Sequence, residues 1–120
     1  MSGRSSARKG ANGERELAVL LRQHGYDIQR GGSLSFGEVP DLSGLPGVHI
    51  ECKRCEHLRL SEWMAQAEQD AQRFQDGAPA VFFRRSREGW RVVMNLPDWM
   101  AIYAKAQGCK CGGYCQNRKE

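Results

Sequence analysis

No run of apolar residues in this chain approaches the roughly 18 residues that a membrane-spanning helix needs. The first residues also lack the apolar segment of a secretory signal peptide. Neither internal repeats nor a second core-forming region can be found, and 120 residues suffice for one modest core. These absences predict a soluble, cytoplasmic protein without a membrane partner, with a single domain over residues 1–106.

Cysteine is present in an odd number, five, and a cytosolic chain is not expected to rely on disulfides. Residues 107–120 form a Cys- and Gly-rich basic tail. Zinc usually takes four ligands, so a tail site would need a fourth from Cys55, a histidine or another protomer. The sequence therefore favours a reduced, disordered tail over a zinc site built on the three clustered thiols, Cys109, Cys111 and Cys115.

Positive charge is moderate in amount but clustered. The formal net charge is +4, and three clusters stand out: Arg4, Arg8 and Lys9; Arg84, Arg85 and Arg87; and Lys110, Arg118 and Lys119. Clusters of this kind suit a polyanion such as nucleic acid, although many charge runs only form solvated faces.

The stretch PDLSGLPGVHIECK, residues 40–53, carries the strongest chemical signal. Its glycine-rich turn predicts a hairpin of two strands, Asp41–Leu45 and Val48–Lys53. Side chains alternate along a strand, so Glu51 and Lys53 share one surface, and Asp41 on the partner strand could come within reach of Glu51. Cys52 falls on the opposite, apolar face, where cysteine behaves as a small hydrophobe.

This combination of side chains suits metal-assisted chemistry on a phosphate. Magnesium prefers oxygen ligands and keeps several waters, so two carboxylates with vacant positions make a plausible site. A lysine beside them could orient a water or offset charge that develops on a phosphate. Asp41, Glu51 and Lys53 are therefore the candidate unit.

A helix is predicted before this stretch, running to His24 and ending at Gly25, after a disordered start over residues 1–6. Ser6 and Asn12 are alternative N-caps. Glu14 falls on the buried stripe that Leu17, Ala18 and Leu21 define, whereas Glu16 points to the opposite side. Because an unpaired buried charge is costly, Glu14 lies at the rim or has a partner such as a metal or a cation. Arg15 leaves this face sideways and could reach a phosphate.

The remaining elements complete an α/β pattern. A strand is expected over Tyr26–Arg30, where Arg30 is a second candidate phosphate contact before a glycine-rich loop. Ser61 caps a helix to Gln75, and on its border Gln66 could hydrogen-bond a metal-bound water or a phosphate, or simply face solvent. A hairpin and a last helix starting near Pro97 follow. The order helix, three strands, helix, two strands, helix predicts a central mixed β-sheet flanked by helices.

With Glu14, Asp41, Glu51 and Lys53 identified, the chain resembles the PD-(D/E)xK nuclease superfamily, and most of all the archaeal-type Holliday-junction resolvases. The likeness covers about residues 8–94 and rests on RKGANGERELAVLLRQHGYDIQR at 8–30, PDL at 40–42 and HIECK at 49–53. It implies a restriction-endonuclease-like fold and Mg²⁺-dependent hydrolysis of DNA, with Mn²⁺ as a substitute. The long loop after Arg30 and the cysteine tail depart from the family pattern.

The resemblance also implies a role for each matching residue. Asp41, Glu51, the Cys52 backbone carbonyl and Glu14 would hold the metal, with Lys53 as the catalytic lysine. The expected DNA contacts are Arg8, Lys9, Arg15 and Arg30. The expected protein is a homodimer that resolves four-way junctions of branched double-stranded DNA in recombination and repair. Its small size and basic tails favour a phage or prophage origin, and a phage-encoded protein would work in the host cytoplasm. Two alternatives stay open: a nicking or restriction-type nuclease of the same fold, and a non-catalytic DNA-binding protein.

Overall fold

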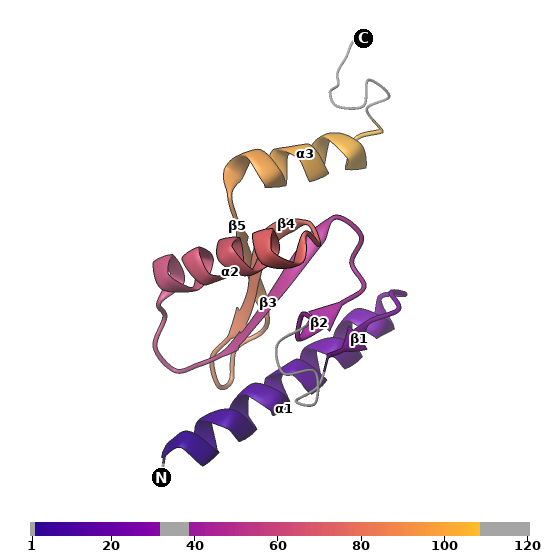
Figure 1. Cartoon of the computed structure of the whole chain (residues 1–120). Coiled ribbons are helices and arrows are strands. Elements are labelled where there is room, and N and C mark those ends of the chain that lie inside the picture. Colours follow the sequence, from indigo (N-terminus) through magenta and orange to yellow (C-terminus); the bar gives the residue numbers. More distant parts are fainter. Residues whose placement is uncertain (1, 32–38, 109–120) are drawn as a thin grey trace.

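The computed structural model describes residues 2–31 and 39–108, with side chains from Gly10 onward. Within these ranges the chain alternates helices and strands in the predicted order (Figure 1). The elements are α1 (Ser2–Gln23), β1 (Gln29–Arg30), β2 (Leu42–Ser43), β3 (Val48–Arg54), α2 (Leu60–Phe74), β4 (Ala78–Arg84), β5 (Arg91–Met94) and α3 (Leu96–Ala106).

Helix α1 is longer than the sequence pattern predicts. It begins at Ser2, so residues 2–6 are helical rather than disordered, and both predicted N-caps, Ser6 and Asn12, lie inside the helix. The Asn12 side chain instead accepts a hydrogen bond from Arg15, 2.6 Å away, within the same helix. Gly13 is buried where α1 crosses β3, because a Cβ atom there would lie 2.6 Å from the Cγ atom of Arg54.

The strands form a two-stranded and a three-stranded sheet. In the larger sheet β3 pairs with β4 in parallel, and β4 pairs with β5 antiparallel, so the sheet is mixed as predicted. The predicted hairpin of β2 with β3 is wrong, because β2 pairs antiparallel with β1 instead. Both partners in this small sheet are only two residues long, against five predicted for each. Gly44 turns the chain between β2 and β3 with a φ angle of +131°.

Two apolar clusters hold the helices to the two faces of the three-stranded sheet. Leu17 and Ala18 of α1 are buried against Ile50 and Phe82 on one face. Trp63 and Ala67 of α2 are buried against Val81 and Phe83 on the other face. Helix α2 starts one residue before the predicted cap Ser61 and ends at Phe74, where the left-handed conformation of Gln75 caps the last turn. The strand β3 is therefore held between two helices that reach it from opposite faces.

Helix α3 differs from the other two because none of its residues is buried. It leaves the end of β5 and lies apart from the sheet, at the far side of the molecule from the start of α1 (Figure 1). Its first turn contains the predicted proline, Pro97. Within the described ranges, no helix has the length and apolar character required to cross a membrane.

Candidate active site

The four predicted catalytic residues line one open cavity. Glu14 reaches it from α1, Asp41 from the residue before β2, and Glu51 and Lys53 from β3. The cavity has a volume of about 450 Å³, and its other lining residues are Gly10, Cys52, Arg54 and Gln66. Segments that are far apart in sequence thus bring three carboxylates and one amine together.

Strand geometry fixes the pair on β3. Glu51 and Lys53 are two residues apart, so both side chains point to the α2 face of the sheet. The Lys53 Nζ atom lies 3.8 Å from the Glu51 Oε2 atom. It also donates a hydrogen bond to the Gln66 Oε1 atom, 2.9 Å away on α2. Gln66 therefore contacts the amine of the predicted catalytic lysine rather than only solvent.

Glu14 does have a charged partner, which was one of the two alternatives for an acid on the buried stripe. The Arg30 Nη2 atom donates to its Oε1 atom at 3.4 Å, and the Glu14 side chain is 20% exposed. Burial is the main cause that raises the pKa of Glu14, and the nearby Asp41 carboxyl raises it further. Arg30 only partly offsets these two effects.

The cavity fits a divalent cation on chemical grounds. Glu14 and Asp41 repel each other, as the raised pKa of Glu14 records, and a bound cation would relieve that repulsion. Glu51 contributes a third carboxylate to the same lining, which makes an all-oxygen donor set of the kind that magnesium takes. The three acids keep an unbalanced negative charge, because among the described residues only the Lys53 amine and Arg30 offset it, whereas the guanidinium of Arg54 is paired with Glu16.

The Cys52 sulfur is poorly suited to act as a ligand here. Its side chain packs against the apolar cluster that includes Leu17 and Ile50. Burial raises the pKa of the Cys52 thiol to about 12, and the carboxylates of Glu14 and Glu51 add to the shift. A thiol with this pKa remains protonated near neutral pH, and only the thiolate binds metals well.

The predicted DNA-contacting arginines lie in different surroundings. Arg15 is exposed on α1, next to Asn12. The Arg30 side chain is 28% exposed beside Glu14, and its buried Nε atom has no hydrogen-bond partner among the residues that the structure describes. Arg8 and Lys9 belong to α1, but their side chains lie outside the described part of the structure. The same holds for the whole predicted zinc group, Cys109, Cys111 and Cys115.

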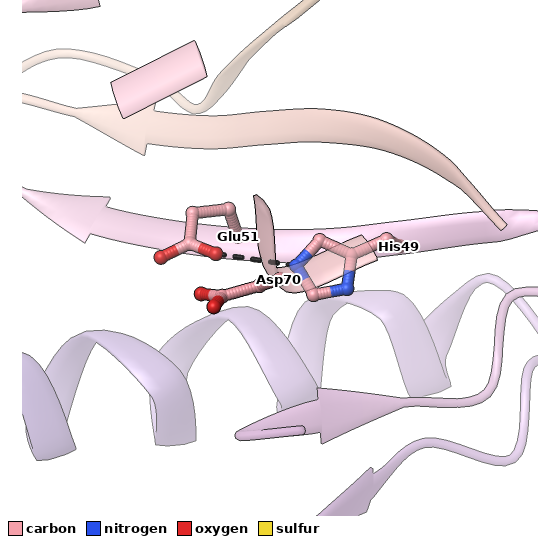
Figure 2. Close-up of side chains that lie close together, drawn as sticks. All are labelled: His49, Glu51 and Asp70. Atoms are coloured by element: carbon pink, nitrogen blue, oxygen red, sulfur yellow. Dashed lines mark hydrogen bonds and ion pairs between the residues drawn. The ribbon is translucent and has the colours of Figure 1, made fainter. Parts of the chain in front are cut away.

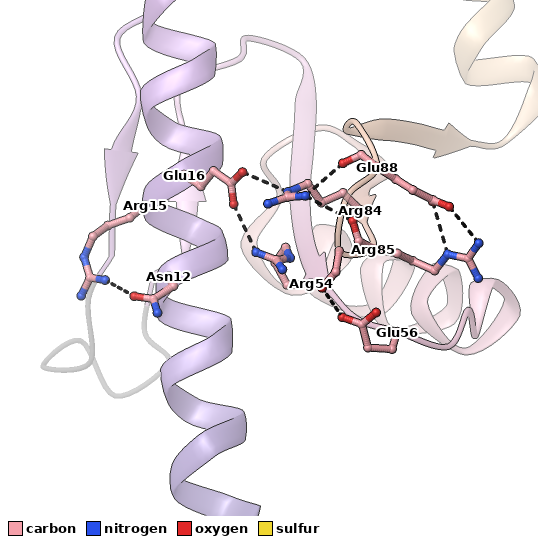
Figure 3. Close-up of polar contacts among 9 residues, drawn as sticks. Asn12, Arg15, Glu16, Arg54, Glu56, Arg84, Arg85 and Glu88 are labelled. Carbon is pink, nitrogen blue, oxygen red and sulfur yellow. Dashed lines mark hydrogen bonds and ion pairs between the residues drawn. The ribbon is translucent and has the colours of Figure 1, made fainter.

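Glu16 does not point away from the body of the protein as the helical pattern predicts. Its carboxylate accepts hydrogen bonds from Arg54 on β3 at 3.3 Å and from Arg84 on β4 at 2.9 Å (Figure 3). Glu88 binds three arginines. Its backbone carbonyl accepts a hydrogen bond from Arg84, and its carboxylate accepts hydrogen bonds from Arg85 and Arg91. Much of the central basic cluster thus serves internal ion pairs rather than a free surface.

Sequence reasoning missed a buried histidine next to Glu51. His49 is 2% exposed, and its Nδ1 atom lies 2.9 Å from both oxygens of Asp76. Its Nε2 atom lies 3.2 Å from the Glu51 Oε1 atom, and Asp70 of α2 approaches the same point (Figure 2). Burial lowers the pKa of His49, but the hydrogen bonds to Glu51 and Asp76 outweigh burial and raise it overall. The available signal was the spacing of two residues between His49, Glu51 and Lys53, which places all three side chains on one face of the strand.

Comparisons with known proteins bear on this site. A family model described as "Phage putative PDDEXK endonuclease" matches residues 5–110. Among solved structures, the chain is similar to Hjc of Archaeoglobus fulgidus, a Holliday junction resolvase from an archaeal hyperthermophile. The two share 27% sequence identity, the match covers 72% of each chain, and the TM-score is 0.53. No curated protein matches the chain. The predicted restriction-endonuclease-like fold is confirmed.

Proposed function

Since the chain belongs to the PDDEXK endonuclease family of phages, we propose that it is a metal-dependent endodeoxyribonuclease that resolves four-way DNA junctions. Its family and its fold make the protein a nuclease of the PD-(D/E)xK type. One observation carries the assignment of the site: Glu14, Asp41, Glu51 and Lys53 line a single open cavity.

Each residue of the cavity receives a role in this proposal. Asp41, Glu51 and the Cys52 backbone carbonyl hold Mg²⁺, for which Mn²⁺ can substitute, and Glu14 completes the acidic set. When bound, the ion supplies Lewis acidity toward the phosphoryl group and makes water more acidic. Lys53 places one positive charge beside Glu51, where it orients the attacking water and stabilises negative charge on the phosphate in the transition state. Gln66 holds the Lys53 amine in this position.

Contacts with the DNA backbone are assigned to basic residues near the cavity. Arg30 lies beside Glu14 with its side chain 28% exposed, so the exposed part of its guanidinium could donate to a phosphate oxygen. Arg15 is exposed on the same helix as Glu14. Arg8 and Lys9 precede the cavity on α1 and are proposed as further phosphate contacts. Such contacts position the DNA and carry no sequence preference.

The choice of a junction as substrate is supported by the similarity to Hjc, a Holliday junction resolvase. Resolution requires a cut in each of two strands, so we propose a homodimer with one cavity per protomer, acting in the host cytoplasm. Helix α3 supplies a suitable surface, because its large apolar side chains are exposed: Leu96, Trp99, Met100, Ile102 and Tyr103. Antiparallel packing of α3 on its copy would place Asp98 of each helix near Lys105 of the other.

A cleavage assay tests this function directly. The substrates are a labelled four-way junction and a linear duplex with the same arm sequence, each with Mg²⁺, with Mn²⁺ and with a chelator. We expect paired, metal-dependent cuts in the junction alone. Equal cutting of both substrates would contradict the resolvase function and indicate a nicking or restriction-type nuclease. Binding without any cutting would indicate a non-catalytic DNA-binding protein.

A further inference from the structure

We propose that His49, Glu51 and Asp70 form a second cation site, which takes a divalent transition-metal ion through one imidazole nitrogen and two carboxylates. One potential ligand atom from each residue lies within 4.8 Å of the other two. Figure 2 shows the three side chains close together; His49 and Glu51 belong to β3, and Asp70 belongs to α2. Only Glu51 is shared with the cavity described above.

The orientation of His49 provides an independent argument. An ionised carboxylate can only accept hydrogen bonds, so the Nδ1 atom donates its proton to Asp76, whose oxygens both lie 2.9 Å away. This bond fixes the ring and directs the Nε2 atom toward Glu51, 3.2 Å away, and a bound ion would replace the proton that Nε2 otherwise donates to Glu51. Histidines that bind metals almost always donate the other ring nitrogen to a carboxylate or carbonyl in this manner. Asp76 therefore acts as the positioning residue of the proposed site.

The spacing suits a small ion after minor adjustment. Ligands bound at about 2.0–2.2 Å stand roughly 3.0–3.4 Å apart when they are neighbours around a metal. The distance from His49 Nε2 to Glu51 Oε1 already lies in this range, at 3.2 Å. Asp70 makes no hydrogen bond to either residue, so its carboxylate can turn toward an ion without breaking such a contact (Figure 2).

The ligand set also indicates which ions the site prefers. His49 is 2% exposed, so the site offers a buried imidazole to the ion. Imidazole suits later first-row ions such as cobalt, nickel and zinc better than magnesium, which keeps to oxygen ligands. The cavity lined by Glu14, Asp41 and Glu51 offers only oxygen from its acids. The two sites would thus differ in metal preference, with the Glu51 carboxylate between them.

Manganese is the probe that tests this site without relying on cleavage. Free Mn²⁺ is counted by its EPR signal in a titration of the full chain at about pH 8, and pulsed EPR detects nitrogen bound to the ion. Mn²⁺ binds thiolates weakly, so the cysteine tail contributes little. We expect a ¹⁴N signal in the wild-type protein that His49→Gln removes. Asp70→Asn should lower the affinity of this ion about tenfold or more, as should Asp76→Asn.

Two controls separate this site from the cavity and from misfolding. Asp41→Asn changes a residue of the cavity alone and should keep the ¹⁴N signal, even if the proposed nuclease assignment fails. Glu62→Gln removes an exposed acid from the same helix as Asp70 and should leave Mn²⁺ binding unchanged. Circular dichroism verifies that each variant is folded. A nitrogen signal that persists in His49→Gln, or Mn²⁺ binding unchanged in Asp70→Asn, would overturn the site.

Discussion

The amine of Lys53 lies 3.8 Å from Glu51 and 2.9 Å from Gln66, and no other lysine whose side chain the structure describes lines the cavity. Its loss should therefore impair the chemical step more than DNA binding. For Lys53→Met we expect a cleavage rate about 10²–10³-fold lower under single-turnover conditions, the usual effect of removing one group that stabilises a transition state. The dissociation constant for DNA, measured without metal, should change only slightly.

Arg59→Met is the matched control for Lys53. It also removes one positive charge, but its side chain is 68% exposed and does not line the cavity. Both variants should therefore show similar changes in DNA affinity, and only Lys53→Met should lose cleavage. If the two variants cut DNA at the same rate, Lys53 has no special part in the reaction.

Cys52 provides a test of burial at the base of the site. Its pKa of about 12 leaves only about one thiolate in 10⁴ molecules at pH 8. We expect iodoacetamide to leave Cys52 unmodified in the folded protein and to modify it in urea, as measured by mass mapping of peptides. Alkylation at equal rates in both states would show that this thiol is not buried as described.

At the residue scale, the helix and strand periods were sufficient to place three of the four predicted catalytic side chains. The placement of Glu14 on the buried stripe and of Glu51 with Lys53 on one strand face follows from periods of 3.6 and 2, and both agree with the structure. The surroundings of His49 could not be predicted in this way. Its partners Asp70 and Asp76 come from α2 and the loop after it, and only tertiary packing brings them to β3.

Among the secondary-structure elements, α1 is joined to β3 and β4 by the Glu16 carboxylate, which binds both Arg54 and Arg84. The two arginine side chains are only 16% and 19% exposed, so their charges are poorly solvated without this acid. Glu16→Gln should reduce the free energy of unfolding by about 1–2 kcal/mol, measured by urea denaturation. The exposed pair of Glu62 with Arg59 is the comparison, where Glu62→Gln should cost less than about 0.5 kcal/mol. Equal losses in the two variants would contradict this role for Glu16.

At this scale the sequence predicts which elements exist better than how they pair. The elements α2 and β3 carry clear apolar patterns and appear within a few residues of their expected bounds. The pairing of β2 was predicted wrongly, because a glycine-rich turn between two short strands is typical of a hairpin. In the structure Gly44 allows a close approach to the backbone of Asp27, and β2 pairs with β1 instead of β3.

For the molecule as a whole, the exposed apolar surface of α3 predicts self-association. Two chains of 13.5 kDa would give a particle of 27 kDa in light scattering. Replacing Trp99 and Ile102 together with glutamate should yield a monomer at the same protein concentration, because two buried apolar contacts would be exchanged for charges. Val19→Glu, at a similarly exposed position on α1, should leave the dimer intact. A wild-type monomer would contradict the proposed dimer.

The overall architecture was predictable because the order of elements restricts a chain of this size to few arrangements. Helices on both faces of a mixed sheet were expected from that order and are observed. The exposure of α3 was not expected. An apolar helix pattern predicts that the helix is buried, but it does not distinguish burial within the same chain from burial against a second chain.

The most direct test of the central claim is the single-turnover cleavage rate of Asp41→Asn on a labelled four-way junction with Mg²⁺, beside its DNA affinity without metal. Asp41 lines the cavity but does not belong to the proposed second cation site. We predict a rate at least about 10³-fold below wild type, with an affinity within about threefold, because the variant removes a metal ligand and no phosphate contact. Cleavage at the wild-type rate by Asp41→Asn would contradict the assignment of this cavity as the active site.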